Sequence, residues 1–263
     1  MKASLWVERA IEACWLGAVA LVPLATTLSG QTVPFVSAPK VFVLRSLAVL
    51  AVVLAAAAWS LRSPTSRWNP IVIAGLVIFL VTAFSAALSP LPAVSIEGVR
   101  PGWDSYALYS VGAYVAIFVV VAFHLRSPKQ FERLAWTVTG TAIVLGFYGV
   151  LQRFGLDPLG IPMNGSRVPL TMGNPVFAAS ALLLMIPVTL AFWQTKRDQM
   201  GPREHVLVGT ALVVFPVISL LFTLTRGALL GFAVAMVTFG VLTVWLKGWR
   251  ATIPGWRVFA DRR

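Results

Sequence analysis

The chain has 263 residues, of which 58% are hydrophobic and only 11% carry a charge. A soluble domain of this length could not bury so much apolar surface, whereas a bilayer leaves that surface in contact with lipid. The composition therefore excludes an ordinary soluble enzyme and indicates an integral membrane protein. The net charge of +12 would suit nucleic acid, but the basic residues are spread over five segments and not along one groove. We therefore expect no nucleic-acid partner, since topology and anionic lipid explain these charges.

Eight apolar stretches are each long enough to cross the bilayer as a helix, which takes about 20 residues. Each stretch is continuously apolar and does not alternate, which predicts helices and not barrel strands. The predicted fold is an all-α polytopic transmembrane bundle, with residues 1–263 as one membrane domain. The predicted spans are 10–28, 41–61, 71–88, 106–125, 134–151, 176–193, 206–225 and 228–246.

The 21 Lys and Arg residues are divided unequally between alternate loops, and this bias predicts the orientation. With the N-terminus inside, 15 of them fall on cytoplasmic segments. Both termini are therefore predicted to be cytoplasmic. The first apolar run is longer than that of a signal peptide and no clear cleavage site follows it, so we expect it to stay uncleaved. The remaining basic residues lie outside or in the outer halves of spans: Lys40, Arg45, Arg100, Arg153, Arg167 and Arg226.

The outer segment 152–175 ends in the triplet Gly173-Asn174-Pro175. Asn is a good N-cap and Pro fits the first helical position, so the triplet predicts the start of the sixth span. This structural role would by itself explain the triplet. Its consequence is that a helix N-terminus with free N–H groups faces the outer boundary beside Arg167.

A similar start is predicted at Thr225-Arg226-Gly227-Ala228, where the last two spans are almost contiguous. We expect the chain to reverse there, with Gly227 permitting the turn. Arg226 would lie near the outer headgroups, where it either snorkels to water or has an anionic partner. In the second case, Arg167 and Arg226 would form a site for a phosphate or diphosphate, because guanidinium groups fork onto phosphate oxygens.

The remaining reactive side chains predict no metal or cofactor site. His124 and His205 fall at the inner ends of spans, and the single Cys14 supports neither a disulfide framework nor a thiolate cage. No nucleotide-binding loop, nucleophile elbow or carboxylate pair is found.

The outer acids are few, and no catalytic residue is assigned. Asp157 precedes Pro158 and is expected to be a turn residue more than a base. Glu97 or Asp104 could serve as a base at a water-exposed mouth, although Asp104 or Ser105 is expected to cap the fourth span.

Four pieces of sequence stand in a set order along the chain. They are Pro39-Lys40; the span exit 84–90 with Ser95-Ile96-Glu97-Gly98 and Arg100; Gln152-Arg153-Phe154-Gly155-Leu156-Asp157-Pro158 with Arg167 and Gly173-Asn174-Pro175; and Thr225-Arg226-Gly227-Ala228-Leu229-Leu230-Gly231. The ordered set covers nearly the whole chain and resembles the bacterial O-antigen ligase and polymerase-related membrane proteins.

The resemblance implies a glycosyltransferase of the bacterial cytoplasmic membrane. Such an enzyme transfers a glycan from an undecaprenyl-diphosphate carrier to an acceptor hydroxyl on the outer side, without a metal or cofactor. Arg167 and Arg226 match the motif arginines and are expected to contact the diphosphate, while Asn174 shapes the same helix start. Arg100 and Arg153 are secondary candidates. The sugar, the acceptor and the catalytic base stay open.

The chain departs from the family pattern at three points. Thr225 stands where the motif usually has Ser, and Val176 stands where a second Asn is common. Family members also continue beyond the eighth span into further helices and an outer loop with a functional His. We therefore expect this chain, which ends at Arg263, to be the N-terminal part of a longer domain or an inactive relative. A non-catalytic membrane subunit and, less favoured, a transporter remain alternatives.

Overall fold

The computed structural model describes residues 2–26, 34–60, 70–99, 104–196, 199 and 201–247. These residues form helices and contain no strand, so the all-α prediction is confirmed. In chain order the named helices are α1 (Lys2–Leu24), α2 (Pro34–Ser60), α3 (Pro70–Ala87), α4 (Pro92–Glu97), α5 (Leu108–His124), α6 (Pro128–Arg153), the 3-10 turn η1 (Leu170–Met172), α7 (Pro175–Thr195), α8 (Pro202–Phe222) and α9 (Arg226–Lys247).

Each of the eight predicted spans overlaps one long helix: α1, α2, α3, α5, α6, α7, α8 or α9. Within the described ranges, six of these helices are long and apolar enough to cross a membrane. The two others fall short for different reasons. α1 carries Glu8, Arg9 and Glu12 in its first half, and α5 has only 17 residues. The helices therefore fit a multi-pass membrane protein.

The helix ends differ from the predicted span ends. The length of an apolar stretch indicates how much of the chain contacts lipid, whereas a helix ends where its backbone hydrogen bonds end. The structure begins α1 at Lys2, ahead of the predicted 10–28. It begins α2 at Pro34, ahead of the predicted 41–61, so Pro39 lies inside the helix. These polar or Pro-containing turns extend the helices beyond their apolar stretches.

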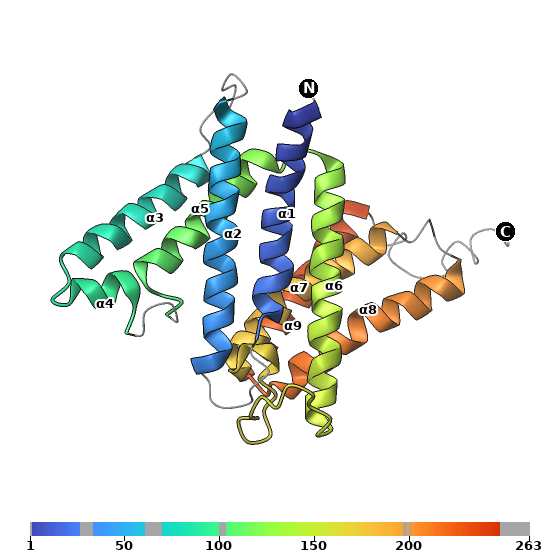
Figure 1. Cartoon of the computed structure of the whole chain (residues 1–263). Helices are drawn as coiled ribbons and strands as arrows, with labels where there is room; N and C mark the ends of the chain where they lie inside the picture. Colours follow the sequence, from blue (N-terminus) through green and yellow to red (C-terminus); the bar gives the residue numbers. More distant parts are fainter. Residues whose placement is uncertain are drawn as a thin grey trace.

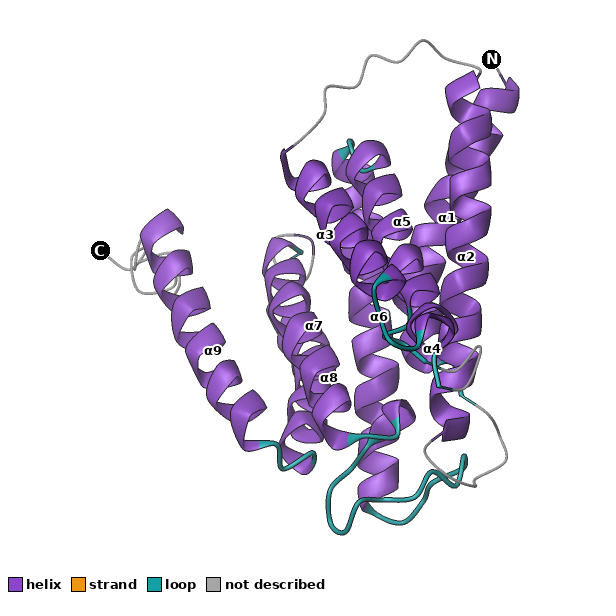
Figure 2. Ribbon diagram, turned by 90° about the vertical axis from the view of Figure 1, so that its left-hand side faces the viewer, coloured by secondary structure: helices purple, strands orange, loops and turns teal. Residues whose placement is uncertain are grey.

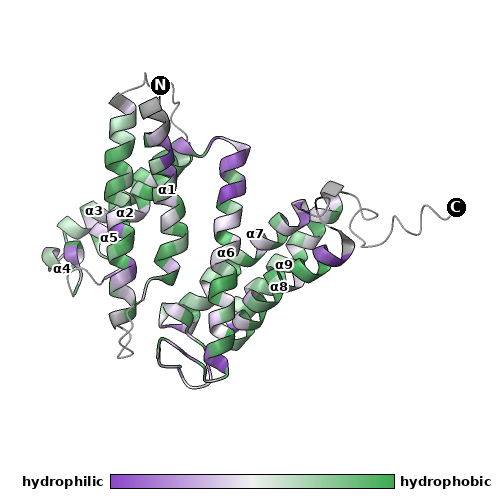
Figure 3. Ribbon diagram, turned by 45° about the vertical axis from the view of Figure 1, so that its right-hand side comes forward, coloured by the Kyte–Doolittle hydropathy of each residue, from purple (hydrophilic) through white to green (hydrophobic). Residues whose placement is uncertain are grey.

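The helices form two groups that α1 joins (Figures 1 and 2). One group packs α1, α2 and α5 around Ile11, Trp15 and Ala51, with α3 against α5. The other packs α6, α7 and α8 around Leu145 and Leu182. α1 contacts both α2 and α6, whereas α9 contacts α7 and α8 and stands at the edge. Apolar residues cover most of the length of the helices (Figure 3).

Small residues let α6 and α8 approach closely. A Cβ atom at Gly146 would lie 2.5 Å from the backbone nitrogen of Pro216, and one at Gly149 would lie 2.6 Å from Ser219 Oγ. Ser219 is fully buried and donates a hydrogen bond of 2.5 Å to the carbonyl of Gly146. Small residues and a buried hydroxyl are the usual means of joining helices in lipid, where burial of apolar surface drives little association.

The helix bundle has two ends with different connections. The loop end comprises the end of α1 at 22–26, the segment 154–174 and the α8–α9 turn at 223–225, which lie together in Figures 1 and 2. The opposite end holds the start of α1 and the α5–α6 connection. α4 and the start of α5 lie partway along α2 and do not reach the loop end (Figure 1).

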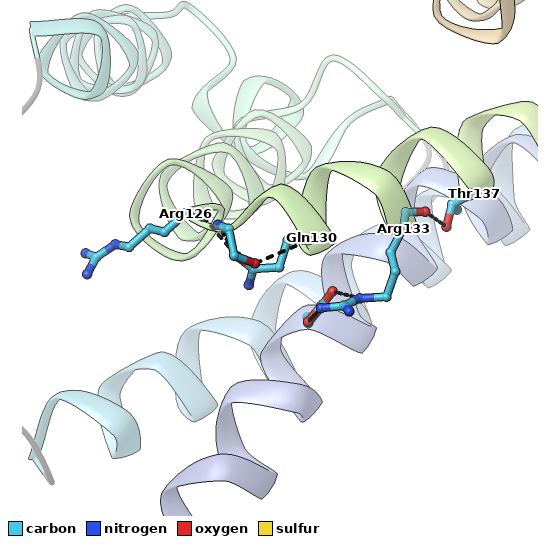
Figure 4. A network of polar contacts seen from close by, with 6 residues as sticks. Arg126, Gln130, Arg133 and Thr137 are labelled. Carbon is cyan, nitrogen blue, oxygen red and sulfur yellow. Dashed lines mark hydrogen bonds and ion pairs between the residues drawn. The ribbon is translucent and has the colours of Figure 1, made fainter. Parts of the chain in front are cut away.

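The opposite end is fastened by charged and polar side chains (Figure 4). Ser127 and Gln130 form a reciprocal capping box at the start of α6. Arg133 then makes a two-point ion pair with Glu12 of α1, with bonds of 2.5 and 2.8 Å. Glu132 pairs with Lys196, the residue that follows α7. These contacts tie α6 to both neighbouring helices.

Candidate functional site: an arginine-bearing junction at the loop end

The segment 154–174 docks into the loop end through η1. This 3-10 turn contacts α1, α2, α6 and α7. Leu170 is fully buried there and adopts a left-handed backbone, with φ of 52°. A non-glycine residue in this conformation is uncommon and costs about 1 kcal/mol or more, so the surrounding packing must hold it. The backbone N–H of Val168 also bonds the carbonyl of Phe222, at 3.1 Å.

Arg167 lies where this segment meets the α8–α9 turn. Its backbone pairs with that of Asn164 in a tight turn, with both N–H···O distances at 3.2 Å. Its Nε donates to the carbonyl of Thr223 at 3.0 Å, and its Nη2 donates to Thr225 Oγ1 at 3.0 Å. The guanidinium group therefore occupies a defined position and retains further N–H donors, because arginine has five.

Thr225 connects three segments of the loop end. Its hydroxyl accepts from Arg167 and lies 3.4 Å from the carbonyl of Pro175 and 3.3 Å from that of Thr223. Its own carbonyl accepts the first helical bond of α9, from Leu229. Thr225 thus lies between Arg167, α7 and α9.

Each residue of the Gly173-Asn174-Pro175 triplet has a structural role. Gly173 ends η1 with φ of 68°, and a Cβ there would lie 3.2 Å from the Cβ of Val36. Asn174 Oδ1 accepts the backbone N–H of Val176 at 2.8 Å, and Pro175 is the first residue of α7. The predicted helix start with Asn as N-cap and Pro next is confirmed.

Arg226 is the first residue of α9, and its side chain is exposed. It makes no hydrogen bond or ion pair with another described residue. The chain reverses between Phe222 and Arg226, as expected, but the predicted role of Gly227 is wrong. Leu224 makes the reversal with φ of 49°, while Gly227 already lies in α9. The left-handed position falls before the helix because α9 begins two residues earlier than the predicted span.

The secondary candidates differ in position. Arg153, the last residue of α6, donates to the carbonyl of Ser166 at 3.1 Å and lies 5.6 Å from the ring of Phe222. It therefore borders the Arg167 turn. Arg100 lies outside the described residues. The junction thus brings together Arg153, Arg167, Asn174 and Arg226 from segments far apart in sequence, and none of the three arginines has a carboxylate partner among the described residues.

Asp157 organises the first half of the loop. It accepts hydrogen bonds from the Tyr148 hydroxyl at 2.7 Å, from Gln152 Nε2 at 3.2 Å, and from the backbone of Leu159 and Ile161 at 2.9 Å each. Burial is the largest single influence and raises the pKa of Asp157, but these hydrogen bonds together outweigh it and lower the pKa. The prediction of a turn residue is confirmed. The partners Tyr148 and Gln152, four apart on one face of α6, were not predicted.

A second unpredicted contact fixes the end of α1. The ammonium group of Lys40 in α2 donates to the carbonyls of Val22, Pro23 and Ala25, at 3.3, 2.8 and 2.6 Å. Thr171 of η1 donates to the same Pro23 carbonyl at 2.7 Å. Three of the four sequence pieces therefore meet through hydrogen bonds, because Lys40 reaches the α1 end that Thr171 also contacts.

The remaining sequence piece lies elsewhere, around α4 (Figure 1). Ser95 Oγ donates to Ser89 Oγ at 2.8 Å in that region. Asp104 accepts the N–H of Tyr106 at 2.8 Å, whereas the N-cap of α5 is Ala107, without a side-chain cap. The prediction that Asp104 or Ser105 caps this helix is therefore wrong, because α5 begins two residues later than the predicted span.

The chemistry that the junction offers is anion binding. It presents arginine donors and no grouping of acids: within the described ranges, no cluster of three or more His, Cys, Asp and Glu side chains could hold a metal ion. Guanidinium groups on a held loop suit phosphate oxygens. His205 lies in the first turn of α8 and His124 ends α5, both remote from the junction.

Comparisons of this chain with protein-family models, with curated proteins and with solved structures find no match.

Proposed function

We propose that this chain acts as a membrane glycosyltransferase of the O-antigen ligase or polymerase type. It would transfer a glycan from an undecaprenyl-diphosphate carrier to an acceptor hydroxyl at the outer face of the bacterial cytoplasmic membrane. One observation carries the proposal: Thr225, which directly precedes Arg226, joins Arg167 to the Gly-Asn-Pro helix start through its hydroxyl group. The resemblance in sequence names these same segments.

The reaction follows from the charge of the leaving group. The acceptor hydroxyl oxygen forms a bond to the anomeric carbon of the glycan and gives up its proton to water, while the bond from that carbon to the diphosphate oxygen breaks. The diphosphate leaves with the bonding electrons, so negative charge grows on it. Arg167 is already oriented by Thr223 and Thr225, and the exposed Arg226 directly follows Thr225 in sequence. Donors placed in advance stabilise such charge without reorganising during the reaction.

The proposed topology has eight spans, including α1 and α5, and both termini on the cytoplasmic side. The alternation of helix ends and the Lys/Arg bias support it. A test replaces Cys14 with Ala and introduces single cysteines at Ser166 and at Lys129. A membrane-impermeant maleimide added outside should label the Ser166 position in intact spheroplasts, and the Lys129 position only after lysis. The reverse pattern would contradict the orientation and, with it, the proposed reaction.

The functional test measures binding and turnover separately. The full chain in proteoliposomes is given undecaprenyl-diphosphate-linked glycan, and released undecaprenyl diphosphate is quantified by chromatography. Binding of undecaprenyl diphosphate itself is measured in detergent. Arg167→Ala and Arg226→Ala should each weaken binding by about tenfold or more, since a hydrogen bond to a charged group is worth roughly 1.5–3 kcal/mol. Arg126→Ala, at the opposite end, is the matched control and should leave binding unchanged.

The outcomes separate the alternatives. Arg167→Lys keeps the positive charge but loses the two-pronged guanidinium geometry. Its affinity for undecaprenyl diphosphate should therefore lie between those of the wild type and Arg167→Ala. Binding without release of undecaprenyl diphosphate would favour a non-catalytic subunit. Unchanged binding and release in both alanine variants would remove the arginine site and overturn the proposal.

A further inference from the structure

Arg45 carries a positive charge inside a membrane-crossing helix. It lies 11 residues after Pro34 in α2, which is about 16 Å along the helix axis. Its Nη2 and Nε donate to Ser110 Oγ at 2.9 and 3.3 Å, and its guanidinium carbon lies 5.8 Å from the ring of Tyr109. Neither neighbour carries a negative charge. Among the described residues, no carboxylate pairs with Arg45.

The Ser110 hydroxyl cannot accommodate this charge by itself. Ser110 is fully buried, and its one proton goes to the carbonyl of Asp104 at 2.7 Å. It therefore acts only as an acceptor toward Arg45, and further guanidinium N–H donors have no partner among the described residues. A charge at this depth costs a few kcal/mol unless it reaches water or an anion.

Arg45 lines an open groove of about 530 Å³ on α2. The other lining residues follow at helical spacing and form one stripe along the helix. Val49 is 65% exposed and Val53 58% exposed, so this stripe is not covered by another described helix. Arg45 lies among these apolar side chains. The lining residues are Phe42, Arg45, Ser46, Val49, Leu50 and Val53.

The surroundings give a polar group access to this depth. α4 and the start of α5 lie partway along α2 (Figure 1). In this region Ser110 accepts hydrogen bonds from Arg45 and donates one to the backbone carbonyl of Asp104. A lipid headgroup beside α5 can therefore meet Arg45 without crossing the full hydrocarbon layer.

We infer that this groove binds an anionic phospholipid of the surrounding bilayer, with its phosphate on Arg45 and an acyl chain along Val49, Leu50 and Val53. The charge of Arg45 selects the anionic headgroup, and the apolar stripe selects the chain. Arg45 is remote from the Arg167 junction in sequence and is not needed for the proposed glycan transfer.

Native mass spectrometry tests the site. The full chain in detergent is equilibrated with equal amounts of phosphatidylglycerol and phosphatidylcholine of the same acyl length. Wild type should retain phosphatidylglycerol in preference. Arg45→Gln should lower its retention by about tenfold, since charge-assisted hydrogen bonds are the strong ones. Arg126→Gln, which removes an exposed arginine at the opposite end, should not change it.

A second variant tests the groove independently, in case Arg45→Gln fails to fold. Val49→Trp fills the groove from an exposed position and should also lower retention, whereas Val234→Trp, on the exposed face of α9, should not. Equal retention by Arg45→Gln and wild type, or no preference between the two lipids in wild type, would overturn the inference. Displacement of the lipid by inorganic phosphate would overturn it too, because the headgroup alone would then suffice.

Discussion

Arg167 and Thr225 are separated by 58 positions along the chain and are joined by a hydrogen bond of 3.0 Å at the loop end. The bond connects the segment before α7 with the turn that leads into α9. Because Arg167 also donates to Thr223, one guanidinium group holds both sides of the α8–α9 reversal. The position of this arginine is thus a product of tertiary structure and not of its local sequence.

Thr225→Val should destabilise the loop end. The change removes the hydroxyl that Arg167 Nη2 donates to and leaves a charged donor without its partner, at a cost of about 1–3 kcal/mol. The unfolding temperature in detergent should fall, and undecaprenyl diphosphate binding should weaken. Thr243→Val is the control, since its hydroxyl bonds only the Phe239 carbonyl within the same helix. Equal stability of the two variants would show that the Arg167 contact contributes nothing.

Gly146→Ala should separate α6 from α8. The new Cβ would lie 2.5 Å from Pro216 N and 2.6 Å from the carbonyl carbon of Phe215, and backbone atoms cannot yield as a side-chain tip can. We expect a loss of about 1–3 kcal/mol, typical of overpacking, as a lower midpoint of thermal unfolding. Gly140→Ala in the same helix meets no atom within 4 Å and should be neutral or stabilising. A neutral Gly146→Ala would contradict the close crossing.

Asp157→Asn should reduce the stability of the protein at neutral pH. It should also remove part of the loss of stability that the wild type shows as the pH falls. The pKa of Asp157 is lowered in the folded chain, so the carboxylate contributes stability above its unfolded pKa of about 3.9. That contribution is lost as the pH falls through the lowered folded pKa. Thermal unfolding of both proteins from pH 7 down to pH 3 should show the gap between them closing. Glu97→Gln, an exposed acid, serves as control, and a constant gap would argue against the linkage.

Lys40→Met should loosen the end of α1. The substitution keeps a long apolar stem but removes the donor to the carbonyls of Val22, Pro23 and Ala25. Unpaired carbonyls in a partly buried site cost about 1–3 kcal/mol. Hydrogen–deuterium exchange should increase at the end of α1 and in η1, which shares the Pro23 carbonyl. Lys129→Met, on the exposed start of α6, should leave both segments unchanged.

The sequence predicts the features that depend on composition and local chemistry. Apolar length located all eight long helices, and Asn174 with Pro175 located the start of α7, because caps act within a few residues. The error at Gly227 has a related cause: glycine is the usual left-handed residue, but packing can hold Leu224 in that conformation instead. Local propensity alone does not reveal such packing.

The contacts of the site could not be predicted, because they join residues far apart in sequence. Lys40 to Pro23, Arg167 to Thr225 and Ser219 to Gly146 all depend on how the helices pack. Tyr148 and Gln152 offered a weak signal, since a spacing of four places two polar side chains on one face of an apolar helix. Their convergence on Asp157 required the path of the following loop.

The two ends of the bundle are held by different kinds of bond, and they should respond differently to concentrated salt. The ion pairs Glu12–Arg133 and Glu132–Lys196 lie at the opposite end, where Arg133 and Glu132 are 49% and 45% exposed. At 1 M ionic strength the screening distance shrinks to about 3 Å, which weakens such pairs. The hydrogen bonds from Lys40 and Arg167 to carbonyl oxygens have a neutral acceptor, so salt should weaken them far less than it weakens these ion pairs. At high salt concentration, local unfolding should therefore begin at the opposite end, while the loop end with Arg167 stays folded.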